Sequence, residues 1–118
     1  MINIKPTIKA ALDAVSTNVN DTYPADWATF PVIQYIEEDN STWEKTDNTE
    51  QKAYIRYKID IWNKASTSAA ALAVDNAIAG LGFVRTLSVD TPDPSGLKHK
   101  VMRYEAVIDV NDMYVYNP

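Results

Sequence analysis

The chain has 118 residues, of which 46% are hydrophobic and 23% are charged, and its formal net charge is −5 at pH 7. These values suit a folded domain and exclude an intrinsically disordered chain. The acidic excess disfavours non-specific binding to nucleic-acid phosphates or to an anionic membrane surface. Cysteine is absent, which excludes disulfides, thiolate metal ligands and cysteine nucleophiles.

The length suits one domain over residues 1–118, because a chain of this size buries roughly two-thirds of its unfolded surface in a single core. No stretch has the length and apolar composition of a signal peptide or a membrane-spanning helix. We therefore expect a soluble protein that is made in the cytoplasm and has no membrane partner.

The first predicted element is a helix over residues 6–20. Its first residue is a proline, which suits the start of a helix, and apolar side chains then recur at helical spacing. The connection over residues 21–31 contains two further prolines and three aromatic residues. We expect these aromatic side chains to fold back onto the core: Tyr23, Trp27 and Phe30.

Two strands are predicted next, over residues 32–37 and 52–62, because the second alternates apolar and polar side chains with a period of two. The segment between them, residues 38–51, is predicted to be a long, mobile hairpin loop. From Glu37 to Glu50 the chain has six acidic side chains and one lysine, a local charge of −5. Trp43 lies within this segment, either packed back onto the domain or presented to a partner.

A second helix is predicted over residues 66–81, with Ser66 available as a cap and Gly82 as the stop. Two more strands follow, residues 83–91 and 98–110, joined by a turn rich in proline, aspartate and glycine. Residues 111–118 are predicted to be a flexible tail. The order is α-β-β-α-β-β, and we expect an α+β fold in which one four-stranded, mainly antiparallel sheet carries both helices on one face.

The sequence offers no convincing catalytic, cofactor or metal site, so we expect no enzyme and no bound cofactor. His99 is the only histidine and is predicted to be exposed at a strand start, and no phosphate-binding glycine loop or nucleophile motif occurs. The carboxylates Glu37, Glu38 and Asp39 match no calcium-loop spacing. A solvated segment therefore explains them better than a cation site.

The polar face of the second predicted strand begins with Tyr54 and ends with Trp62, and it contains Arg56 and Asp60, which we expect to be ion-paired on the outer sheet face. Its aromatic residues suit either packing against residues 21–31 or a protein interface, since tryptophan, tyrosine and arginine are enriched at interface centres.

Two segments carry a resemblance to a known family: YIRYKIDIWNKASTSAAALAVDNAIAGLGFVR at residues 54–85 and KHKVMRYEAVID at residues 98–109. They give a strand ending in an aromatic residue, a helix ending in a glycine turn, and a basic turn leading into a further strand. The chain thereby resembles the tail terminator, or tail completion, proteins of long-tailed bacteriophages and prophages, over most of residues 1–112.

The resemblance implies a structural protein of the virion tail or neck. Such proteins form a ring, typically a hexamer, that caps the tail tube, stops its polymerisation and meets the head connector protein. Another neck protein, a stopper or adaptor, is the alternative within the same particle. A small ligand-binding or enzymatic α+β domain, with its pocket between sheet and helices, is the alternative from another class.

In a ring, one patch of each subunit meets a different patch on its neighbour. The candidates for one side are Tyr54, Arg56, Trp62 and Arg103. The candidates for the other side, or for the tail tube, lie in the acidic segment: Glu37, Glu38, Asp39 and Trp43. Acidic side chains lining the lumen would repel DNA phosphates and let DNA pass without specific binding.

Overall fold

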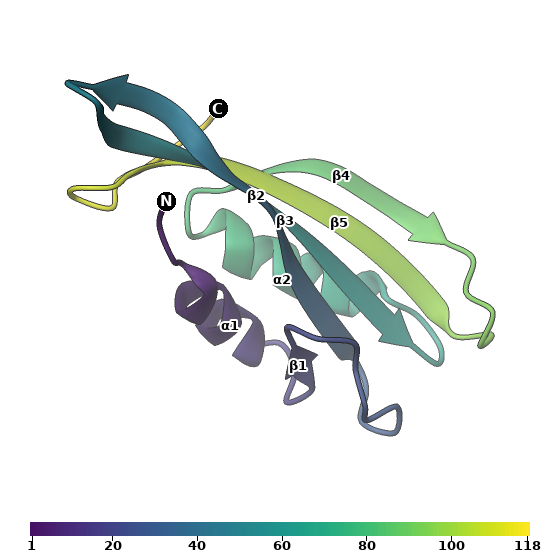
Figure 1. Ribbon diagram of the computed structural model, residues 1–118. Helices are drawn as coiled ribbons and strands as arrows, with labels where there is room; N and C mark the ends of the chain where they lie inside the picture. Colours follow the sequence, from purple (N-terminus) through teal and green to yellow (C-terminus); the bar gives the residue numbers. More distant parts are fainter.

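The computed structural model describes residues 1–118 and contains two helices and six strands (Figure 1). Their bounds are α1 Lys5–Asp13, β1 Val19–Asn20, β2 Val32–Thr46, β3 Thr49–Asn63, α2 Ser68–Ala79, β4 Val84–Thr91, β5 Lys98–Asp109 and β6 Val115–Tyr116. The sheet order is β1-β2-β3-β5-β4, and β6 pairs with β5. Only the β1–β2 pair is parallel, so the sheet is mixed.

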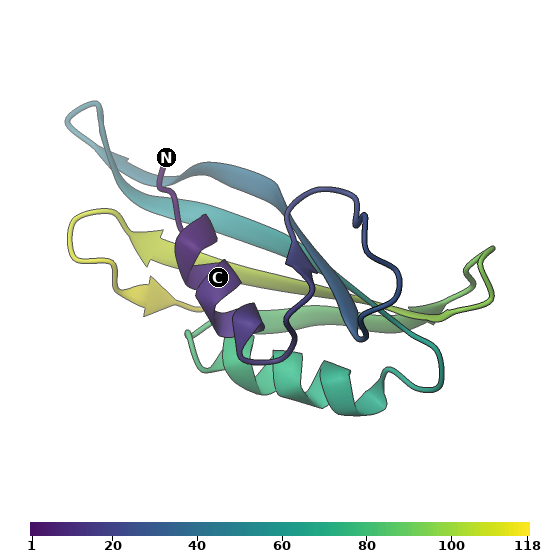
Figure 2. The same cartoon turned by 90° about the horizontal axis from the view of Figure 1, so that it is seen from below.

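Both helices lie on one face of this sheet, α1 beneath β1 and β2 and α2 beneath β4 (Figures 1 and 2). The core lies between the two layers, because alternate residues of β3 and β5 point towards the helices. Its fully buried large side chains include Ile55, Tyr57, Ile59 and Ile61 from β3, Met102, Tyr104 and Ile108 from β5, and Ile8, Leu12 and Ile78 from the helices.

The predicted α+β class is confirmed, whereas the predicted four strands are wrong because two short strands are added. The first of these, β1, exists because α1 ends at Asp13 and not near residue 20. Hydrogen bonds to residues distant in the sequence hold the chain after α1 in an extended form. The Ser16 hydroxyl donates to the Pro31 carbonyl at 2.6 Å, and the side-chain amide of Asn18 donates to the carbonyl of Asp26 at 2.8 Å.

The predicted loop over residues 38–51 is also wrong. Strands β2 and β3 continue through it and meet in a two-residue turn, where Asp47 and Asn48 have φ values of 51° and 61°. Positive φ at both positions is the geometry of a type I′ hairpin turn, which Asp and Asn tolerate. This half of the hairpin projects beyond the helices, as Figure 1 shows. Because no helix packs on it, its side chains are exposed towards the tip, and polar residues suit both of its faces.

The tail over residues 111–118 was expected to be flexible, but it contains β6, which pairs antiparallel with β5. Val115 of β6 packs against the core next to Gly82. Gly82 has the predicted left-handed conformation after α2, with φ 96°, and an added Cβ would lie 3.0 Å from Val115 Cγ1. A glycine is therefore required there both by the backbone and by the approach of β6.

Candidate interaction surface

The sheet face opposite the helices, here called the outer face, has no helix covering it (Figure 2). The alternation of β3 directs Tyr54, Arg56, Lys58, Asp60 and Trp62 to this face. Their cross-strand neighbours on β5 are Val107, Glu105, Arg103, Val101 and His99, which therefore project to the same side. Most of the contact residues predicted from the sequence therefore lie together on the outer face.

An ionic cluster of Glu38, Arg56 and Arg103 occupies the middle of the outer face. A bulge in β2 places Glu38 and Asp39 opposite the single residue Arg56, which brings the Glu38 carboxylate over β3. Glu38 Oε1 lies 2.9 Å from Arg103 Nε and 3.3 Å from Arg56 Nε. The hydrogen bond from Arg103 is the largest cause of a lowered Glu38 pKa.

An aromatic pair, Trp43 and Tyr54, lies next to this cluster towards the hairpin tip. A second bulge, between Thr42 and Glu44, places Trp43 over Tyr54, with ring centroids 6.1 Å apart and planes inclined by 25°. The Tyr54 hydroxyl donates to Glu105, and burial raises the Tyr54 pKa. Trp43 is 55% exposed, so it rests on the strand beneath it and still presents a wide apolar surface.

Trp62, predicted as a contact residue, is packed within the domain and only 5% exposed. Trp27 meets it edge-on with centroids 5.1 Å apart, and His99 stacks on it at 4.5 Å. Its indole N–H donates to Asp93 Oδ1 at 3.2 Å. The interpretation that Trp62 packs against residues 21–31 is the correct one, although Tyr23 of the same segment stays exposed.

His99 and Asp60 form a buried pair, which corrects two expectations. His99 was predicted to be exposed, yet its side chain is 12% exposed, and its Nε2 lies 2.8 Å from Asp60 Oδ1. Asp60 is 3% exposed and its other oxygen lies 3.6 Å from Lys58 Nζ, so it does not pair with Arg56. Only the register of β3 against β5 brings His99 opposite Trp62.

The acidic residues do not form one cluster. The Glu37 side chain faces the helix side, where it accepts hydrogen bonds from the Tyr57 hydroxyl at 3.3 Å and from the Asn40 amide at 3.2 Å. Glu38 belongs to the outer face, and Asp39 makes no ion pair. No group of three or more His, Asp or Glu side chains is placed to hold a metal ion.

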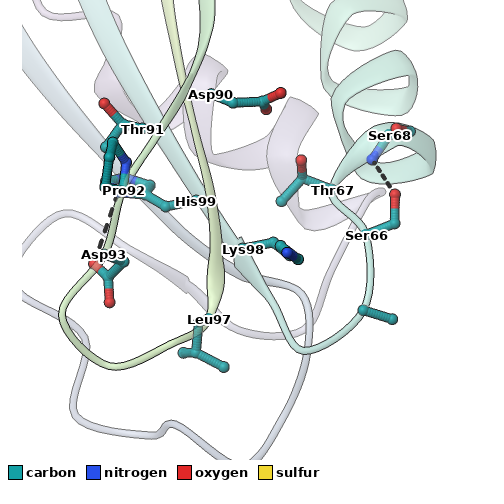
Figure 3. A pocket seen from close by; sticks show the side chains of 11 residues that line it. Ser66, Thr67, Ser68, Asp90, Thr91, Pro92, Asp93, Leu97, Lys98 and His99 are labelled. Carbon is teal, nitrogen blue, oxygen red and sulfur yellow. Dashed lines mark hydrogen bonds and ion pairs between the residues drawn. The ribbon is translucent and has the colours of Figure 1, made fainter.

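An open pocket of about 540 Å³ lies between the start of α2 and the β4–β5 turn (Figure 3). Figure 3 shows Ser66 and Thr67 on one side and Asp93 and His99 on the other, with Lys98 between them. The lining is polar and of mixed charge, and the Ser66 hydroxyl is already engaged by the Ser68 backbone N–H at 3.2 Å. Nothing here aligns a nucleophile with a base.

Sequence reasoning missed the exposed edge of the sheet formed by β4, most of whose residues are exposed. Its Val84 and Val89 belong to the outer face, and Leu72 of α2 lies beneath the same edge on the other side. The sequence predicted a strand over residues 83–91, but the place of that strand at the edge depends on sheet order, which the sequence does not encode locally.

A scan against protein-family models found no match to this chain, and a search among curated proteins found no similar sequence. Neither of the two helices is long and apolar enough to cross a membrane.

Proposed function

We propose that this chain is a structural protein of a long-tailed phage or prophage particle, the tail terminator. In this function it assembles as a ring, a hexamer by the resemblance, that caps the tail tube, stops its polymerisation and meets the head connector. It acts in the virion neck and assembles in the host cytoplasm. DNA passes through the ring without specific binding.

The observation that carries the proposal is the outer face, a sheet surface without a helix cover on which tryptophan, tyrosine and arginine lie together. Trp43, Tyr54, Arg56 and Arg103 are neighbours there, and these residue types dominate the energetic centres of protein interfaces. Together with the resemblance of residues 54–85 and 98–109, this favours an assembly protein over an enzyme.

Negative-stain microscopy of particles made without this protein tests the proposal. A terminator limits tube growth, so its deletion is expected to give overlong tails, and supply of the wild-type chain in trans is expected to restore the normal length. Tails of normal length without heads would instead indicate a stopper or adaptor. Particles indistinguishable from wild type would refute both assignments.

A matched pair of variants ties the result to the outer face. Arg103→Glu places a carboxylate beside Glu38 and reverses the charge of the cluster, whereas Thr22→Glu adds an acidic group to the exposed connection before β2. The first variant is expected to fail to restore tail length and the second to restore it. Circular dichroism of both purified chains checks that each is folded.

A further inference from the structure

We infer that copies of this chain join edge to edge, with β4 of one copy pairing antiparallel to the distal half of β2, residues 35–46, of the next. The inference rests on the proposed function in one respect, that copies of the chain assemble with one another. It specifies which two surfaces meet, how the strands run and which side chains are covered.

The sheet has two free edges, one on each side. Strand β4 ends the sheet order and pairs only with β5, while β1 covers β2 only at Ile33 and Gln34. Beyond these positions the outer edge of β2 has no partner strand through Thr46, and its ladder with β3 is irregular at three places between Glu37 and Lys45. Each edge therefore presents unpaired backbone N–H and C=O groups, and one surface complements the other.

The strand directions of the sheet allow the pairing to repeat. Each neighbour in β2-β3-β5-β4 is antiparallel, so β4 runs opposite to β2. Within one chain β4 lies level with residues 32–39 of β2, so the rotation axis is inclined to the strands. The rotation then staggers β4 along the neighbour's β2 to residues 35–46 and keeps the two strands antiparallel. Such a head-to-tail contact closes into a ring when the rotation divides a full turn.

Strand β4 has little of the protection that edge strands usually carry. It contains no proline and no lysine, and its charged residues are already paired within the chain: Arg85 with Asp75 at 3.0 Å and Asp90 with Lys100 at 3.4 Å. One irregularity, between Arg85 and Leu87, leaves the remainder of β4 in regular register. Natural edges are normally blocked by charge, proline or strong bulges.

Both layers of the domain would continue across the contact. On the helix side, α2 and its Leu72, which is 69% exposed, lie at the β4 edge, while α1 and the exposed Met1 lie at the β2 edge. On the outer face, Val89 is 41% exposed at one edge and Trp43 is exposed at the other. The same rotation places the helix layer of one copy beside the helix layer of the next, and outer face beside outer face. The contact therefore covers Leu72 and Met1 on the helix side and Val89 and Trp43 on the outer face.

Charge variants at one β4 position discriminate this contact from a generic apolar one. Of the four acidic side chains in residues 35–46, Asp39 lies opposite Arg56 on the outer face and makes no ion pair, so its charge is available to repel a carboxylate at position 89. Val89→Glu is therefore expected to lower the association constant of the copies at least tenfold more than Val89→Lys. Equal effects of the two substitutions on association would count against β2 as the partner.

Disulfide trapping gives the decisive result, since the natural chain has no cysteine. We expect Val89→Cys mixed with Ser41→Cys or Asp39→Cys to give a mixed dimer on oxidation, and Val89→Cys mixed with Thr22→Cys to give none. A chain carrying Cys at 89 and 41 or at 89 and 39 should yield a ladder that ends at the ring's subunit number. Thermal unfolding of each variant confirms that it is folded.

Light scattering of the same samples separates the two possible failures. A ring-sized species of the wild-type chain without any β4–β2 crosslink at either β2 position would overturn this inference and leave the proposed function standing. A chain that stays monomeric at high concentration and in the presence of its tail tube would overturn both.

Discussion

Glu38 on β2 and Arg103 on β5 are joined by two hydrogen bonds although β3 lies between their strands. Arg103 Nε lies 2.9 Å from Oε1 and its Nη2 lies 3.3 Å from Oε2. The bulge at Glu38 makes this reach possible, because it leaves an extra residue on β2 opposite Arg56. The pair holds the Glu38 and Arg103 side chains in place on the proposed interface. Its contribution to stability can be tested by changing the pH.

Glu38→Gln is expected to lower the free energy of unfolding at pH 7 by about 1 kcal/mol, since it weakens charge-assisted hydrogen bonds at a partly exposed site. The pKa of Glu38 is lowered in the folded chain from its ordinary value of 4.5. As the pH falls below 4.5, the unfolded chain binds the proton first, so the stabilisation is lost. Urea unfolding at pH 7 and pH 3 measures the difference.

The matched control for this prediction is Asp39→Asn, which removes a neighbouring charge that makes no ion pair. It is expected to change stability by less than about 0.5 kcal/mol at either pH. If Glu38→Gln lowers the free energy of unfolding by the same amount at pH 3 and at pH 7, the lost stability does not come from the carboxylate.

Asp60→Ala is expected to destabilise the fold by about 3 kcal/mol, because it leaves the buried His99 ring without its partner at 2.8 Å. Asp60→Asn retains a carbonyl oxygen that can accept from His99, and it is expected to cost less. Denaturant unfolding at pH 7 compares the two variants. If both lose the same stability, the pair does not act through this hydrogen bond.

The buried phenols of Tyr57 and Tyr104 predict a loss of stability at alkaline pH. Burial is the largest cause of their raised pKa values, and the hydrogen bond from the Tyr104 hydroxyl to Asp75 at 2.8 Å adds to it. Above pH 10, the ordinary value, the unfolded chain releases these protons and the folded chain retains them, so stability falls as pH rises.

Absorbance of tyrosinate, followed together with circular dichroism, measures this effect among the seven tyrosines. Tyr104→Phe is expected to lower stability at neutral pH by about 1 kcal/mol and to reduce the alkaline loss. Ionisation of all seven tyrosines while the fold persists would contradict the prediction.

Trp43→Ala is expected to weaken association of the copies at least tenfold and to change monomer stability by less than about 1 kcal/mol. The reason is its position, since Trp43 is 55% exposed and stacks on Tyr54 at the surface of the sheet. Tyr23→Ala, which removes an exposed aromatic side chain from the connection before β2, is the control and should leave association unchanged. A large loss of thermal stability with intact assembly would show that Trp43 is structural.

Local sequence signals determined the α+β class, both helices and the buried faces of β3 and β5. Apolar residues such as Ile55 and Ile59 recur with the period of a strand, and a glycine at 82 ends the helical segment, because periodicity and backbone conformation depend on near neighbours. The polar segment over residues 38–51 misled the prediction, since the hairpin projects away from the core and has no apolar face to bury.

The tertiary structure alone decided how the candidate residues are grouped. Arg56 and Arg103 lie 47 positions apart and share the Glu38 carboxylate, while Trp62 is hidden beneath Trp27 and His99. These outcomes depend on strand order, register and two bulges, which arise from pairing between distant segments and leave no local trace. For the same reason only the assembled sheet identifies β4 and the distal half of β2 as its free edges.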